Sequence, residues 1–131
     1  MDVLVDTSVW IDYFKGGTKS ADMDGLIDNN LIVTNNLILA ELIPFLKIKR
    51  HHKVIRLLYD VRRLPLDIDW EHIINCQQGC LKKGANGIGI PDLIIAQNAK
   101  NSDAFIYSLD KHFKLLQSVL KFDLYNVITE K

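Results

Sequence analysis

The chain has 131 residues, of which 48% are apolar and 24% are charged. This length and composition are typical of one folded globular domain and exclude a mainly disordered chain. Sixteen basic and sixteen acidic residues cancel, which excludes a nucleic-acid binder that is basic overall but permits a local basic patch. Two cysteines, Cys76 and Cys80, are too few for a disulfide-stabilised scaffold.

The sequence contains no recognisable targeting or membrane segment. Its first residues lack the positive and long apolar regions of a signal peptide. The longest apolar region, residues 37–46, is interrupted by Glu41 and Pro44 and is too short to span a bilayer. We therefore expect a cytoplasmic protein with reduced thiols, folded as a single domain over residues 1–131.

Short apolar runs alternate with amphipathic segments along the chain. The runs predict strands at residues 2–6, 31–33, 64–66, 104–107 and 122–127. Capping residues and apolar periodicity predict helices at residues 7–14, 20–28, 36–47, 51–60, 69–83, 91–100 and 111–117. Three glycines predict a loop at residues 84–89, and Pro91 suits the first position of the helix that follows. This alternation indicates an α/β domain whose parallel sheet is covered on both faces.

Four acidic residues lie where such a fold binds its ligands, beyond the carboxyl ends of the strands. Asp6 ends the first predicted strand, and Asp110 follows the fourth. Asp92 begins a helix, and Glu41 is the only charged residue between Asn36 and Leu46, inside an otherwise apolar helix. The four can converge if the first and fourth strands are neighbours. Such a cluster is tolerable only with shared protons or a bound divalent cation, since like charges repel.

Each acid also has a purely structural explanation. Asp6 and Asp110 are favoured helix caps, and Asp92 complements a helix dipole. Glu41 can point outward from a helix that is only partly buried, although a buried carboxylate among so many apolar neighbours needs a polar partner. The residues alone leave these alternatives open.

Four segments together resemble the motifs of one family, the PIN-domain ribonucleases, and most closely the VapC-type toxins of type II toxin–antitoxin pairs. The segments are Val3-Leu4-Val5-Asp6-Thr7-Ser8-Val9-Trp10-Ile11-Asp12, Leu39-Ala40-Glu41-Leu42, Ile90-Pro91-Asp92-Leu93-Ile94-Ile95-Ala96 and Tyr107-Ser108-Leu109-Asp110-Lys111-His112-Phe113. The acids follow one another at intervals of 35, 51 and 18 residues, in the order of the family. Ser108 stands where a threonine is more usual.

The resemblance implies a fold, a reaction and a set of site residues. The fold is a three-layer α/β/α PIN-like domain with a parallel sheet of about five strands in the order 3-2-1-4-5. The reaction is Mg²⁺- or Mn²⁺-dependent endonucleolytic hydrolysis of RNA, which leaves a 5′-phosphate and a 3′-hydroxyl. The residues that match the catalytic and metal-binding acids are Asp6, Glu41, Asp92 and Asp110. Thr7 or Ser8 matches the hydroxyl that supports the first acid, and Ser108 has a similar part near Asp110.

The family also implies partners, namely an RNA substrate, a small cognate antitoxin and a second copy of the chain. Residues 47–63 carry seven basic residues against one acid, a block that suits a polyanion or, equally, a solvated helix face. Lys111, beside Asp110, is the nearest candidate RNA contact. The more distant candidates are Lys47, Lys49, Arg50 and Lys53.

Other functions fit less well. A catalytically silent PIN-fold module that binds RNA or protein and a PIN nuclease of RNA processing or decay are the main alternatives. A phosphatase of the haloacid-dehalogenase type requires an acid where Ser8 stands. His72, Cys76 and Cys80 share one helix face, which is more typical of core packing than of a zinc site.

Overall fold

A computed structural model of the chain describes residues 1–125, whose backbone forms one five-stranded sheet. The strands are β1 (Val3–Val5), β2 (Ile32–Thr34), β3 (Arg62–Arg63), β4 (Phe105–Tyr107) and β5 (Asp123–Leu124). They lie in the order β3-β2-β1-β4-β5, and each neighbouring pair is parallel. In the register, Leu4 pairs with Val33 on one side and with Ile106 on the other. The predicted parallel sheet and strand order are confirmed.

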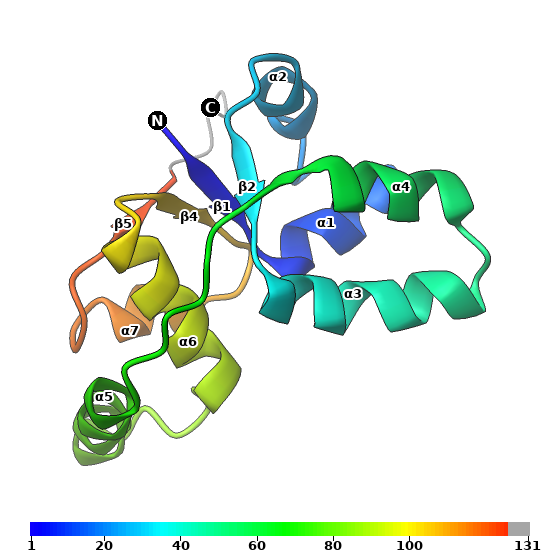
Figure 1. The fold of residues 1–131 in the computed structure, drawn as a ribbon. Helices are drawn as coiled ribbons and strands as arrows, with labels where there is room; N and C mark the ends of the chain where they lie inside the picture. Colours follow the sequence, from blue (N-terminus) through cyan, green and yellow to red (C-terminus); the bar gives the residue numbers. More distant parts are fainter. Residues whose placement is uncertain (126–131) are drawn as a thin grey trace.

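Seven helices accompany the sheet in the described residues. They are α1 (Thr7–Phe14), α2 (Met23–Asp28), α3 (Asn36–Ile48), α4 (His52–Asp60), α5 (Trp70–Lys82), α6 (Ile90–Asn101) and α7 (His112–Leu116). Figure 1 shows α1, α3 and α4 on one side of the strands and α5, α6 and α7 on the other. This is the expected three-layer α/β/α arrangement. This arrangement follows because the chain runs from β1 through β2 to β3 at one edge of the sheet and then returns to place β4 on the other side of β1.

The core lies around the two central strands. All three residues of β1 are fully buried, as are Ile106 and Tyr107 of β4. Helix α1 contributes Trp10, which is fully buried and stacks on Phe14. Helix α6 is buried at every residue from 93 to 99, so it lies deep against the sheet. Burial on both faces explains why the central strands read as continuous apolar runs in the sequence.

The third strand was predicted at residues 64–66 and is instead Arg62–Arg63. Both arginines are exposed at the sheet edge, and Arg62 forms a 2.7 Å ion pair with Asp2. The prediction was wrong because it followed apolar side chains, whereas an edge strand is defined by backbone pairing and often carries charges. Pairing still extends to Leu64, whose N–H donates to the carbonyl of Thr34 at 2.8 Å.

Two other element boundaries differ from the prediction by more than one residue. Helix α2 begins at Met23 rather than at residue 20, and the N–H of Ser20 donates to the carboxylate of Asp12. The last strand covers Asp123–Leu124, and residues 126 and 127 of the predicted strand lie outside the described residues.

Cysteines Cys76 and Cys80 are buried on α5 and are not joined in a disulfide. Their thiols pack in the core, as the sequence predicts, and burial raises the pKa of both. Within residues 1–125, no helix has both the length and the apolar character needed to cross a bilayer.

Two buried asparagines tie the helix that carries Glu41 to the opposite layer. Asn35 caps α3 by accepting from the N–H of Ile38 at 2.8 Å, and it donates to Asn98 of α6 at 2.9 Å. Asn98 in turn donates to the carbonyl of Pro65 at 2.9 Å. Asn35 is 0% and Asn98 5% exposed, so these bonds are shielded from water.

We expect Asn98→Ala to lower the free energy of unfolding by about 1–3 kcal/mol, because it leaves a buried donor of Asn35 and the carbonyl of Pro65 without their partner. Urea unfolding followed by circular dichroism measures the change. The exposed Asn101→Ala, on the same helix, is the control and should stay within about 0.5 kcal/mol of the parent. Equal effects of the two substitutions would contradict a structural role for the bond.

Candidate active site

Asp6 lies at the point where β1 ends and α1 begins, and it is only 7% exposed. Its Oδ2 atom accepts two hydrogen bonds, from Ser8 Oγ at 2.9 Å and from Ser108 Oγ at 2.8 Å. Asp6 occupies the N-cap position of α1, yet its side chain makes no capping hydrogen bond. The capping explanation for Asp6 therefore fails, and its carboxylate instead faces the end of β4.

The two serines join the ends of the central strands. Ser8 Oγ accepts from the N–H of Leu109 at 3.0 Å, and Ser108 Oγ accepts from the N–H of Asp110 at 2.9 Å. Their own oxygen atoms are 3.3 Å apart. The same hydroxyls that hold Asp6 thus also fix the backbone that carries Asp110.

Thr7 has a different partner from its neighbour Ser8. Its Oγ1 donates to Oε1 of Glu41 at 3.0 Å and so connects α1 to α3. Successive helix residues point about 100° apart, which sends the two hydroxyls to different acids. The structure places Ser8, rather than Thr7, on Asp6.

Glu41 lies on the exposed face of α3, and its carboxylate is nonetheless part of the cluster. Its pKa is raised, first by partial burial and then by the negative charges of Asp6 and Asp92, while the hydrogen bond from Thr7 acts in the opposite direction. The buried apolar residues of α3 therefore lie on the other face of the helix, whereas Phe45, one turn after Glu41, is exposed.

Asp92 combines a capping role with a place in the cluster. It lies in the first turn of α6, where Oδ2 accepts from the N–H of Gly89 at 3.3 Å. Burial raises the pKa of this carboxyl, and the charges of Asp110 and Asp6 add to the effect. The N–H of Gly89 and the imidazole of His112 lower it in part.

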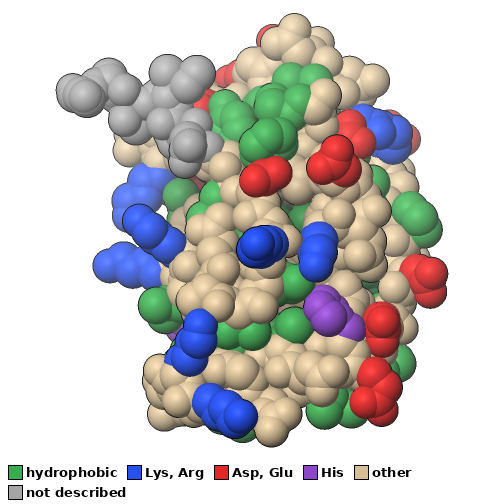
Figure 2. Space-filling view, turned by 90° about the vertical axis from the view of Figure 1, so that its left-hand side faces the viewer, with side chains coloured by type: hydrophobic (Ala, Val, Ile, Leu, Met, Phe, Trp, Pro, Cys, Tyr) green, Lys and Arg blue, Asp and Glu red, His purple; other side chains and the backbone are tan. Residues whose placement is uncertain are grey.

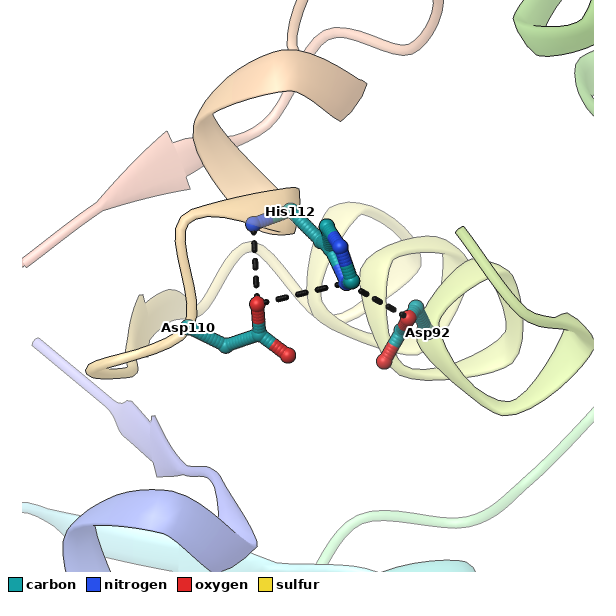
Figure 3. A group of neighbouring side chains, drawn as sticks. All are labelled: Asp92, Asp110 and His112. Carbon is teal, nitrogen blue, oxygen red and sulfur yellow. Dashed lines mark hydrogen bonds and ion pairs between the residues drawn. The ribbon is translucent and has the colours of Figure 1, made fainter. Parts of the chain in front are cut away.

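Asp110 and His112 complete the group (Figure 3). Oδ1 of Asp110 accepts from the backbone N–H of His112 at 2.9 Å. The imidazole Nδ1 of His112 is 3.3 Å from Oδ1 of Asp110 and 3.9 Å from Oδ2 of Asp92. The residues predicted from the sequence to form the site do not include His112. Its position two residues after Asp110, within the fourth motif, was the signal available.

The donor set fits a divalent cation. One ligand atom each from Asp92, Asp110 and His112 lies within 4.8 Å of the others, and Asp6 and Glu41 act electrostatically on the same group. Carboxylate oxygens are hard ligands of the kind that Mg²⁺ and Mn²⁺ prefer. A cation there relieves the repulsion that raises the pKa of Glu41 and Asp92.

The candidate RNA contacts divide into a near and a far group. Lys111 is adjacent to Asp110 and lines, with Lys114, an open hollow of about 500 Å³ beside β4 and β5. Lys49, the residue that caps the C-terminus of α3, lies about 12 Å beyond Glu41 along the helix axis. Arg50 lies in the turn before α4, and Lys53 lies in the first turn of α4. The structure does not bring this second group, which includes Lys47, to the acids. On the side shown in Figure 2, most Lys and Arg side chains lie on the left and in the centre, and most acidic side chains lie at the top and on the right.

Comparison with known proteins identifies the family. The model of the PIN domain family matches residues 3–118, and the chain therefore belongs to that family. No curated protein sequence matches the chain.

Solved structures share the fold at low sequence identity. VapBC2 from Rickettsia felis, bound to a DNA fragment from its promoter, is 20% identical with a TM-score of 0.75, over 97% of this chain and 99% of that one. FitAcB from Neisseria gonorrhoeae is 19% identical with a TM-score of 0.70, over 95% and 96%. VapBC-1 from nontypeable Haemophilus influenzae is 20% identical with a TM-score of 0.68, over 96% and 98%.

We expect Asp92→Asn to stabilise the metal-free protein at neutral pH. The pKa of Asp92 in the folded protein lies above its ordinary value of 3.8. Well below pH 3.8 the carboxyl is protonated in both the folded and the unfolded protein, so the substitution has little effect on stability there. As the pH rises through the folded pKa, the parent loses stability because its ionised carboxylate is disfavoured in the fold. Asparagine avoids this loss and can still accept from the N–H of Gly89.

Urea unfolding in chelator from about pH 3 to pH 7.5 measures this effect as a difference that grows as the pH rises above 3.8 and levels off above the folded pKa. The exposed Asp67→Asn is the control and should show no such growth. Added Mn²⁺ should reduce the difference, because an ion that binds the folded parent stabilises it. A difference that is independent of pH would contradict the electrostatic explanation.

Proposed function

We propose that the chain is a metal-dependent endoribonuclease that hydrolyses RNA phosphodiester bonds. The observation that carries the proposal is the convergence of four carboxylates at the carboxyl ends of β1 and β4, with Asp6 held there by two serine hydroxyls. Membership of the PIN family supports it. VapC20 from Mycobacterium tuberculosis, described as a Sarcin-Ricin loop cleaving toxin, shares the fold at 14% identity and a TM-score of 0.58.

In this proposal Asp6, Asp92 and Asp110 hold Mg²⁺ or Mn²⁺. A bound divalent cation supplies an activated water at neutral pH and neutralises charge that develops on the phosphate. Both serine hydroxyls use Oδ2 of Asp6, and we assign its Oδ1 to the ion. Glu41, fixed by Thr7, orients the attacking water. Lys111 holds the RNA backbone at the rim of the site by charge.

We further propose that this nuclease is the toxin of a type II toxin–antitoxin pair and acts in the cytoplasm. The neighbours from R. felis and H. influenzae are VapBC proteins, and a further neighbour is a toxin–antitoxin complex from Klebsiella pneumoniae, at 14% identity and a TM-score of 0.62. The cognate antitoxin would silence the enzyme by covering the acidic site or displacing its metal.

Exposed apolar surface supports protein partners, an antitoxin and a second copy of the chain. A hollow of about 350 Å³ between α1 and α3 is lined by Phe14, Leu42 and the half-exposed Phe45. On α5, Trp70, Ile74 and Leu81 are more than half exposed and recur on one helix face. Apolar groups gathered in this way are typical of surfaces that another protein covers.

The purified protein should cut a structured RNA pool with Mn²⁺ or Mg²⁺ and lose this activity in chelator. We expect Asp6→Asn to lower the cleavage rate by about 100-fold or more, the scale of losing one charge-stabilising group. Ser108→Ala should lower it by about 10- to 100-fold, since it removes a partner that orients a ligand. Gel analysis of end-labelled RNA measures both rates.

Asp67→Asn and Lys100→Ala, both at exposed positions outside the site, are the controls and should cleave at the parental rate. Folding of every variant is checked by circular dichroism. Metal binding by calorimetry without cleavage of any RNA would favour a catalytically silent binding module. Cleavage that persists in Asp6→Asn would exclude the proposed site.

Expression of the chain without an antitoxin should arrest growth of the host cells, because free nuclease depletes an essential RNA. Asp6→Asn, at the same expression level, should leave colony counts within a factor of about ten of the empty vector. Growth that is unaffected by an active nuclease would contradict the toxin assignment and favour a role in RNA processing or decay.

A further inference from the structure

The imidazole of His112 lies among the acids, and the proposed function assigns it no part. Its Nδ1 atom is 3.3 Å from Asp110 Oδ1 and 3.9 Å from Asp92 Oδ2, and the three donor atoms all lie within 4.8 Å of one another. Ligand atoms about 2.1 Å from a common ion lie about 3–4.2 Å apart. Nδ1 thus has the spacing of a third ligand of a single cation.

One hydrogen bond and the absence of a side chain at Gly87 permit this orientation of the ring. The backbone N–H of His112 donates to Asp110 Oδ1 at 2.9 Å, which fixes the residue beside the carboxylate. On the other side of the ring, a Cβ atom at Gly87 would lie only 2.7 Å from Nε2. Because glycine has no side chain, Gly87 leaves room for Nε2. Figure 3 shows the opposite side of the ring, where Nδ1 faces the two acids.

An imidazole nitrogen changes which ion a site prefers. Mg²⁺ demands oxygen ligands and sheds its water reluctantly, whereas first-row transition metal ions accept nitrogen readily. A site made only of carboxylates has no such preference. We propose that His112 Nδ1 is a direct ligand of the ion bound by Asp92 and Asp110, and that it makes the site selective for a transition metal ion over Mg²⁺. This inference rests on the proposed metal-dependent function.

The test uses the whole chain loaded with Mn²⁺ alone, whose unpaired electrons report a bound nitrogen in pulsed electron paramagnetic resonance. We expect a ¹⁴N coupling of imidazole type in the parent and in the control His52→Gln, which replaces an exposed histidine on α4. The coupling should be absent from His112→Gln. Gly87→Ala should weaken or abolish it by displacing the ring, although this substitution alters no ligand atom.

Calorimetry gives an independent measure of selectivity. We expect His112→Gln to weaken Mn²⁺ binding by at least about tenfold, the lower end of what loss of a ligand-orienting group costs. Mg²⁺ binding should weaken by a smaller factor. Equal losses for the two ions would overturn the selectivity part of the proposal. Circular dichroism of each variant, together with Gly87→Ala as a second variant that keeps the imidazole, separates a ligand role from a folding defect.

The outcomes distinguish this inference from the proposed function. Mn²⁺ bound to the parent without a ¹⁴N coupling, or a coupling that survives in His112→Gln, would overturn the role of His112 and leave the acidic metal site standing. Absence of Mn²⁺ binding would overturn both proposals. A ¹⁴N coupling in a protein that cuts no RNA would support the ligand assignment and count against the nuclease.

Discussion

The carboxylate of Asp6 is the contact on which the rest of the site depends. It lies almost fully buried between the two central strands, where an ionised group is costly without donors. Ser8 and Ser108 supply those donors from either side of the strand pair, and their oxygens accept from the backbone that leads to Asp110. One anion and two hydroxyls therefore set the relative position of the acids at the ends of β1 and β4.

The sheet topology makes this contact possible. The strand order reverses between β1 and β4. The loops that follow these two strands therefore lead to opposite helical layers, and the space beyond the carboxyl ends of the strands stays open. Helices α3 and α6 then bring Glu41 and Asp92 toward this edge from the two layers. Burial, and then the repulsion between the acids, raises the pKa of both residues, which is a cost in folding free energy that binding of a cation offsets.

Structural and functional explanations of the acids coexist in the same residues. Asp92 accepts from the N–H of Gly89 as a helix cap does, and Asp110 accepts from the N–H of His112. These bonds hold each carboxylate through one oxygen, and two oxygens are available on every carboxylate. Asp6 caps no helix with its side chain, and Glu41 bonds Thr7 across two helices. A capping bond at an acid is therefore no argument against a place in the site.

The sequence by itself determined the parallel α/β fold and the positions of the central strands and indicated four candidate acids, because buried strands, helix caps and motif spacing are local signals. Tertiary structure decided the features that depend on contacts between residues far apart in the sequence. It placed β3 at Arg62–Arg63, where backbone pairing replaces apolar side chains. It gave Thr7 and Ser8 different partners, Glu41 and Asp6, because the two side chains point in different directions from α1. It placed Nδ1 of His112 beside Asp92 and Asp110, with the ring in a space that a side chain at position 87 would fill.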